Sequence, residues 1–111
     1  MDPRFELRFL EPTVEFLEKQ PASVSQKILF NIEKARQSND PELFKKLDDD
    51  IWEFRTTYNG IRYRLLAFWD KRKKANILVV CTHGIIKKTS KVPSKEIKRA
   101  RSIMILYLAN P

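Results

Sequence analysis

The dipeptide Asn59-Gly60 constrains the fold of this chain more than any other feature of its sequence. Asn-Gly is the preferred pair for a two-residue β-hairpin turn, because both central residues of that turn take positive φ angles. Strand-like segments flank it, so we predict paired strands over residues 51–57 and 61–69. The two positions of every opposed pair then sum to 119, and one face of the hairpin is largely apolar: Trp52 opposite Ala67, Phe54 opposite Leu65 and Thr56 opposite Tyr63.

The other face of this hairpin brings two like charges together. Arg55 lies opposite Arg64, and directly opposed like charges destabilise an isolated hairpin. Glu53 is two residues from Arg55 on the same face and can form a structural ion pair with it. Alternatively, the two guanidinium groups can clamp an anion, such as an RNA phosphate. The sequence leaves both explanations open.

The remaining patterns place helices and further strands around the hairpin. Pro12, Pro21 and Pro93 suit the first turn of a helix, and Pro21 also ends the helix before it. The expected elements are a strand over 4–9, helices over about 12–20, 21–35 and 93–108, a short helix from Asp40 to about Leu47, and a strand over 77–82. This order predicts a single α+β domain over residues 1–111. In it, an N-terminal strand and a helical hairpin pack on an antiparallel β-sheet, in the order β-α-α-β-β-β-α apart from the short helix.

Composition restricts the class of protein. The chain has 111 residues, 42% of them hydrophobic and 32% charged, which is typical of one globular core. No apolar run reaches the roughly 20 residues that cross a bilayer, and the charged N-terminus has no signal-peptide pattern, so we expect no membrane partner. The lone Cys81 fits a reducing compartment, and we expect a cytoplasmic protein.

Positive charge is concentrated in the second half of the chain, within a net charge of +8. Residues 51–111 contain fourteen basic and three acidic residues, whereas residues 1–50 contain eight and eleven. A basic half on a small domain favours a polyanionic partner. A solvated basic surface is the alternative.

One segment of this basic half combines several groups suited to anion binding. A buried apolar strand is expected to end just before His83, the only histidine, and Lys87, Lys88 and Lys91 follow ahead of a proline that can open a helix. Strand ends and helix N-termini both suit anions. One pairing of this strand with the hairpin puts His83 opposite Arg62, on the arginine face.

These residue types suit phosphodiester chemistry without a metal or cofactor. The sequence has no clustered carboxylate, His or Cys ligands in its basic half and no glycine-rich phosphate loop. RNA carries its own nucleophile, the 2′-hydroxyl, so an enzyme needs only cations and proton transfer. His83 can act as acid or base, since a histidine has a pKa near ~6.5, or it can be a strand-end histidine bonded to a carbonyl. The candidate phosphate-binding cations are Arg55, Arg64, Lys87 and Lys88.

Several sequence fragments occur in a characteristic order: Leu43 to Leu47, Trp52-Glu53-Phe54-Arg55, Tyr63-Arg64, His83 to Thr89, Pro93, Glu96-Ile97 and Ala100. Together, over about residues 12–108, they resemble the HigB-like branch of the RelE/ParE superfamily, the toxins of type II toxin–antitoxin pairs. The resemblance implies a RelE-like fold and a metal-independent, ribosome-dependent mRNA endoribonuclease that inhibits translation. It also implies a cognate antitoxin, which we expect to be a small helix-turn-helix protein.

The resemblance also implies roles for individual residues, because related toxins carry basic residues on the concave face of the sheet. The expected catalytic residues are Arg64, Lys87 and His83, and the expected RNA-binding residues are Arg55, Arg62, Lys88 and Lys91. Three positions depart from the family pattern. Glu53 stands where some relatives have a second basic residue, Val92 replaces a helix-capping threonine, and Tyr107 lies far along the last helix.

Two other functions are open at this stage. The same basic face would serve a non-catalytic RNA- or ribosome-binding module. The ParE-like branch of the superfamily inhibits gyrase through protein–protein contacts.

Overall fold

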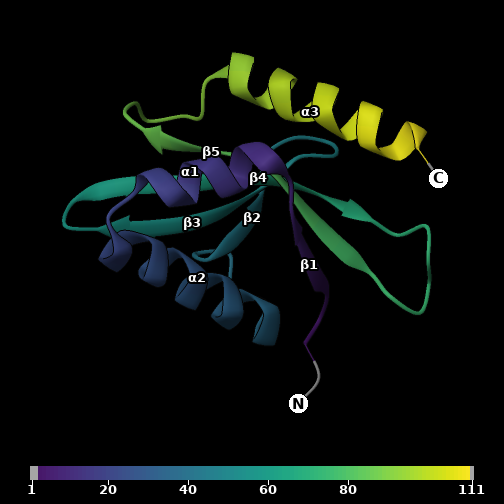
Figure 1. Cartoon of the computed structure of the whole chain (residues 1–111), viewed down its shortest axis with the longest axis horizontal. Coiled ribbons are helices and arrows are strands. Elements are labelled where there is room, and N and C mark those ends of the chain that lie inside the picture. The colour runs from purple at the N-terminus through teal and green to yellow at the C-terminus, as the bar shows by residue number, and fades with distance from the viewer. Residues whose placement is uncertain (1–2, 111) are drawn as a thin grey trace.

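The computed structural model describes residues 3–110 and has a five-stranded sheet in the order β1-β5-β4-β3-β2 (Figure 1). The strands are β1 (Glu6–Phe9), β2 (Phe44–Lys46), β3 (Trp52–Tyr58), β4 (Ile61–Asp70) and β5 (Leu78–Lys87). The helices are α1 (Glu11–Lys19), α2 (Ala22–Gln37) and α3 (Ser94–Ala109). The predicted α+β class and the β-α-α-β-β-β-α order are confirmed.

The predicted hairpin register is also confirmed. Asn59 and Gly60 have φ angles of 52° and 78°, as a two-residue turn of this type requires. Every pair from Trp52↔Ala67 to Tyr58↔Ile61 follows the predicted register. The turn alone therefore sets which residues of β3 and β4 share a face.

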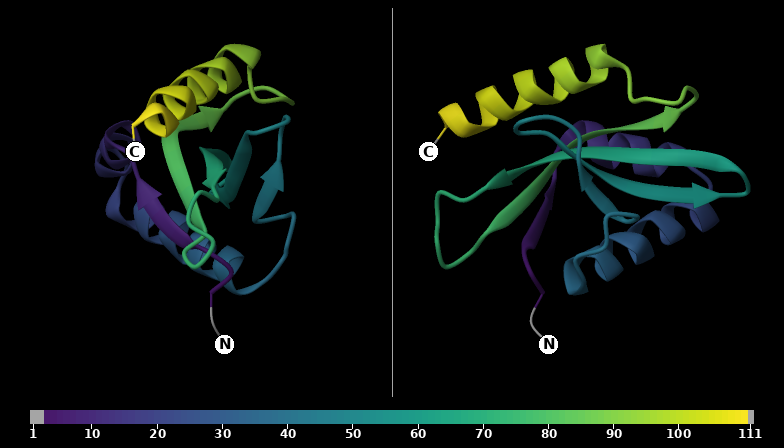
Figure 2. Two further views of the ribbon diagram at one scale, coloured as in Figure 1. Left: turned by 90° about the vertical axis from the view of Figure 1, so that its right-hand side faces the viewer. Right: turned by 180° about the vertical axis from the view of Figure 1, so that it is seen from behind.

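Helices cover both faces of the sheet (Figure 2). The stripe of α2 buries Val24, Ile28 and Ile32 against one face, together with side chains of α1 and with aromatic residues of β1 to β4. Alternate residues of the central strand β4 point to the other face, where Leu66 and Phe68 pack against α3. Both faces of β4 are therefore core beneath the helices, which explains its nearly continuous apolar sequence.

The sheet is mixed rather than antiparallel, because β1 pairs in parallel with β5. The chain leaves β1 through α1 and α2, crosses one face of the sheet, and enters at the opposite edge with β2 (Figure 1). Three antiparallel steps then return it to β5, which runs in the direction of β1. No local pattern in residues 4–9 encodes this choice of partner.

The prediction of a short helix from Asp40 to about Leu47 is wrong. Residues 41–43 form a turn, closed by the amides of Leu43 and Phe44 on the Asp40 carbonyl at 3.0 Å each, and β2 follows. Phe44 is buried and stacks on Phe54 with ring centroids 4.2 Å apart. Pairing with β3 satisfies the backbone and places Phe44 in the core, and this tertiary contact overrides the helix signal of Asp-Pro-Glu.

The predicted end of the last strand at Thr82 is also wrong, because β5 continues to Lys87. A β-bulge between Leu66 and Ala67 leaves one extra residue in β5, so that Cys81 pairs with Ala67 and His83 with Leu66. The predicted pairing of His83 with Arg62 is therefore incorrect, and Lys87 takes that position.

Candidate nucleic-acid interface

Four cations meet on one face of the sheet, near the ends of β3, β4 and β5. The ladder places Arg55 opposite Arg64 and Arg62 opposite Lys87. Side chains alternate along each strand, so all four point away from the face that α1 and α2 cover. We call Arg55, Arg62, Arg64 and Lys87 the basic cluster.

Glu53 is the buried counter-ion of this cluster. Its carboxylate lies 3.2 Å from Arg64 Nε and 3.6 Å from Arg55 Nε, and its side chain is 3% exposed. The geometry of these contacts is not that of hydrogen bonds, since Glu53 Oε1, Arg55 Nε and Arg64 Nε are buried and have no hydrogen-bond partner. The attraction is therefore Coulombic. Of the two explanations for the opposed arginines, the structural ion pair is present.

Arg64 forms the floor of the cluster. Its side chain is 3% exposed and donates a hydrogen bond from Nη1 to the carbonyl of Tyr63 at 3.0 Å. Burial lowers the pKa of Arg64, Glu53 raises it, and Arg55 and Arg62 lower it further. Buried positive charge held by one carboxylate gives this site a positive potential that water screens weakly.

The other three cations are partly exposed. Arg55 reaches Glu42 at 3.7 Å and the Pro41 carbonyl at 3.4 Å. Among the described residues, Arg62 has no carboxylate within 4.0 Å and no side-chain hydrogen bond, so its guanidinium is available to an external anion.

The surroundings of Lys87 lower its pKa. Partial burial lowers its pKa first of all, and the positive charges of Arg64, Arg62 and Arg55 lower it further against the opposing effect of Glu53. A lysine whose pKa is lowered loses its proton more readily near neutral pH. Since arginines stay protonated in proteins, Lys87 is the cation of the cluster that releases a proton most readily.

Lys88 and Lys91 lie on the exposed segment that follows β5. The Thr89 hydroxyl donates to the Lys91 carbonyl at 2.6 Å and shapes this turn. Within residues 3–110, no ion pair or hydrogen bond joins either lysine side chain to the basic cluster. They extend the positive surface beyond the end of the strand.

His83 lies deeper in the molecule than the cluster. Its side chain is 1% exposed, its Nδ1 lies 3.0 Å from the Thr82 hydroxyl, and its Nε2 lies 3.0 Å from Glu96 Oε1 on α3. Burial lowers the pKa of His83, the bond to Glu96 raises it, and Arg99 lowers it. His83 and Arg64 lie on the same sheet face, but α3 covers His83 and both its ring nitrogens have partners.

The structure adds one contact and one residue that the sequence analysis did not connect to the site. Glu53 contacts Arg64 as well as Arg55, which the hairpin register could have indicated, because a diagonal neighbour across a strand pair is within reach. Lys45 pairs with Glu53 on the edge strand β2 and lies on the cluster face. It was missed because its segment was predicted to be a helix.

Among residues 3–110, no group of three or more His, Cys, Asp or Glu residues is arranged to hold a metal ion. In the same part of the chain, no helix is long and apolar enough to cross a membrane.

Comparison with known proteins identifies the family. No curated protein matches the chain. The family described as phage derived protein Gp49-like (DUF891) matches residues 15–104, which include the basic cluster, Glu53 and His83. Since this match spans most of the sequence, the chain belongs to the Gp49-like phage-derived family, a toxin-like family of the RelE/ParE superfamily.

Proposed function

We propose that this protein is a HigB-like toxin of a type II toxin–antitoxin pair that cleaves mRNA on the ribosome and so inhibits translation. Family membership is compatible with a toxin of such a pair. The observation that carries the finer proposal is the basic cluster: four cations around one buried carboxylate on a sheet face. We propose a cognate antitoxin of the small helix-turn-helix class, and a cytoplasmic site of action.

The reaction assigned to the cluster is attack of the RNA 2′-hydroxyl on the adjacent phosphorus, without a metal or cofactor. The new bond closes a 2′,3′-cyclic phosphate, and the bond to the 5′-oxygen of the next nucleotide breaks, with water supplying the proton for that oxygen. Arg62 and Arg55, which are partly exposed, would contact the phosphate oxygens, and Lys88 and Lys91 would hold the flanking backbone. Arg64 would stabilise the developing negative charge from beneath, at short range in a weakly screened site.

Proton transfer is assigned to Lys87, whose pKa is lowered, in preference to His83. The engaged ring nitrogens of His83 suit it to hold β5 against α3. In its neutral form, Lys87 would accept the proton of the 2′-hydroxyl.

The test is primer extension on a reporter mRNA, with purified protein, with and without translating ribosomes. EDTA is added only to the arm with free RNA, because ribosomes need magnesium. We expect cuts only with ribosomes, and their loss in Arg62→Ala, which removes a partly exposed cation that has no ion-pair partner within residues 3–110. The matched control is Lys34→Ala on α2, which removes one exposed charge on the opposite sheet face.

A substitution of Lys87 tests the assigned proton transfer directly. Lys87→Arg keeps the positive charge but cannot act as a base at neutral pH, so cleavage should fall by about 10²-fold or more while ribosome binding persists. In the wild type, cleavage should rise with pH up to an apparent pKa below that of a free lysine.

Two other outcomes would contradict the proposal and support the alternative functions. Transcripts that stay intact while translation stops would indicate an RNA- or ribosome-binding module. DNA damage signalling without RNA cleavage would indicate a gyrase inhibitor.

A further inference from the structure

A second site lies at the opposite end of the sheet, at a cavity of about 800 Å³. It opens between β1, the loop that joins β4 to β5, and the C-terminal end of α3. Its lining residues are Glu6, Arg8, Asp70, Arg72, Lys73, Asn76, Leu78 and Tyr107. Asp70 lies eight positions along β4 from Arg62, so roughly 25 Å of strand separates the cavity from the basic cluster.

The wall of the cavity on α3 is a tyrosine held by two arginines. The Arg8 guanidinium donates to the Tyr107 hydroxyl at 2.8 Å, and its central carbon lies 5.8 Å from the ring centroid. Arg72 lies 5.5 Å from the same centroid and donates to the carbonyls of Leu108 and Asn110 at the end of α3. These contacts fix the positions of both guanidinium groups before any ligand binds.

The two carboxylates of the wall already have partners. Asp70 accepts from Arg72 through both oxygens at 2.9 Å, and this bond lowers the pKa of Asp70. Glu6 lies 3.4 Å from Arg36. Asp70 is therefore neutralised by Arg72, whereas Glu6 is largely exposed and shares Arg36 with Glu33, which lies closer to that arginine, at 2.6 Å.

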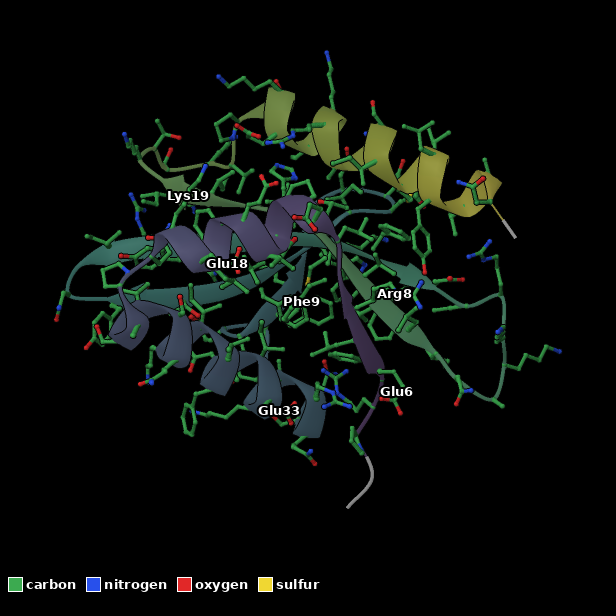
Figure 3. All side chains as sticks on the ribbon, in the orientation of Figure 1. Glu6, Arg8, Phe9, Glu18, Lys19 and Glu33 are labelled. Carbon is green, nitrogen blue, oxygen red and sulfur yellow. The ribbon has the colours of Figure 1, made fainter. Side chains whose placement is uncertain are left out.

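Two cations of the wall are not neutralised. Among residues 3–110, Arg8 and Lys73 have no carboxylate within 4.0 Å. In the same part of the chain, the side-chain amide of Asn76 forms no hydrogen bond, while its backbone N–H donates to the Lys73 carbonyl at 3.1 Å. Figure 3 shows Arg8 and Glu6 on the side of β1 that faces the β4–β5 loop. The cavity thus offers a guanidinium, an ammonium and an amide N–H group, which are donors for an anion.

We propose that this cavity binds the phosphate monoester of a nucleotide, with Arg8 and Lys73 as the phosphate ligands and Asn76 as a further donor. A phosphate monoester carries nearly two negative charges at neutral pH and would supply an ion-pair partner to both Arg8 and Lys73. The planar fork of Arg8 suits two phosphate oxygens at once.

The size of the cavity favours a nucleotide over inorganic phosphate. Its volume lies within the range of small-molecule sites, and a phosphate ion alone would leave most of it unfilled. Leu78 and the edge of Tyr107 supply apolar surface for the base or the ribose. This site is independent of the proposed ribonuclease activity.

The test is titration of the full-length protein with 5′-AMP, followed by calorimetry and by amide shifts in NMR spectra. We expect saturable binding tighter than about 1 mM, with shifts confined to residues around Arg8, Asn76 and Tyr107. Adenosine, which lacks the phosphate, and inorganic phosphate should both bind at least tenfold more weakly than 5′-AMP.

Matched variants distinguish binding in this cavity from non-specific attraction of 5′-AMP to the positive surface. Lys73→Gln should weaken 5′-AMP binding about tenfold, whereas Lys74→Gln, on the same loop but outside the lining, should leave it unchanged. Both residues are exposed, so neither variant should perturb folding. Arg62→Gln should also leave binding unchanged.

Three results would overturn the proposal. They are an absence of saturable binding, equal losses in Lys73→Gln and Lys74→Gln, or binding that disappears in Arg62→Gln and therefore belongs to the basic cluster. A final pair of ligands identifies the source of the phosphate. A trinucleotide RNA that binds with a 5′-phosphate but not with a 5′-hydroxyl supports an RNA end, and binding of 5′-AMP without either RNA supports a free nucleotide.

Discussion

At the scale of single residues, the most consequential side chain is Glu53. It lies on the same strand face as Arg55 and, among residues 3–110, is the one carboxylate buried beside the arginines. Burying Arg64 without a counter-ion would cost far more than the ion pair itself contributes, because an isolated buried charge loses its hydration. Glu53 therefore allows the sheet to carry a buried arginine.

Substitution of Glu53 tests this dependence. Glu53→Gln should lower the free energy of unfolding by about 3–5 kcal/mol, since it leaves Arg64 uncompensated. The double variant Glu53→Leu/Arg64→Leu should regain most of this loss, because it removes both buried charges. Urea unfolding measures both values, and a double variant no more stable than Glu53→Gln would contradict the assigned ion pair.

The buried His83 predicts a pH dependence of stability. Its pKa is lowered mainly by burial, so between that lowered value and about 6.5 the unfolded chain binds a proton that the folded chain does not. Stability should therefore be complete above pH ~6.5 and fall as the pH drops through this window.

Urea unfolding at a series of pH values checks this prediction. The difference in stability between the wild type and His83→Asn isolates the histidine from the carboxylates, Asp48 and Asp70, whose pKa values are lowered. This difference should shrink toward acidic pH. A difference that is constant between pH 5 and 8 would mean that His83 keeps an ordinary pKa.

At the scale of elements, the packing of α1 on β5 decides where the strand surface is covered. Gly84 lies where the ring of Phe16 meets the strand, and a Cβ atom at this position would come within 2.3 Å of that ring. The glycine is thus required by close approach, since its backbone φ is not in the left-handed region. It lets β5 continue beneath α1 toward Lys87.

Gly84→Ala should therefore destabilise the protein by about 1–3 kcal/mol through overpacking. In a Phe16→Ala background the same substitution should cost less than about 0.5 kcal/mol, because the ring is gone. Thermal or urea unfolding of the four proteins completes the double-mutant cycle. Equal costs in both backgrounds would show that Phe16 is not the obstacle.

At the scale of the whole molecule, the uneven charge should control association with RNA. The net charge is +8, and the exposed cations of the cluster lie beside lysines on the following segment. Binding to single-stranded RNA should weaken steeply with salt, as counterions are released from each neutralised phosphate.

Arg62→Gln should reduce the slope of log K against log salt by about 0.7, the value for one phosphate contact on a single strand. Lys34→Gln, on α2, removes the same charge from the other face and should leave the slope unchanged. Fluorescence anisotropy with a labelled non-cleavable RNA measures both slopes. A larger change for Lys34→Gln would place RNA on the helical face.

The sequence by itself determined the features that depend on neighbouring residues. The Asn59-Gly60 turn, the register of β3 and β4, the helical stripes and the opposition of Arg55 to Arg64 all follow from spacing and local conformation. Strand alternation also places Arg62 and Arg64 on the same face as Arg55.

Only the tertiary structure decided the features that depend on distant partners. The core contact of Phe44 with Phe54 converts an expected helix into the edge strand β2. The register of β5 against β4 places Lys87, four residues beyond His83, opposite Arg62, and α3 brings Glu96 onto that histidine. These outcomes are set by packing and pairing between segments far apart in the chain. Local propensity depends only on neighbouring residues, so it does not determine which distant segments come into contact.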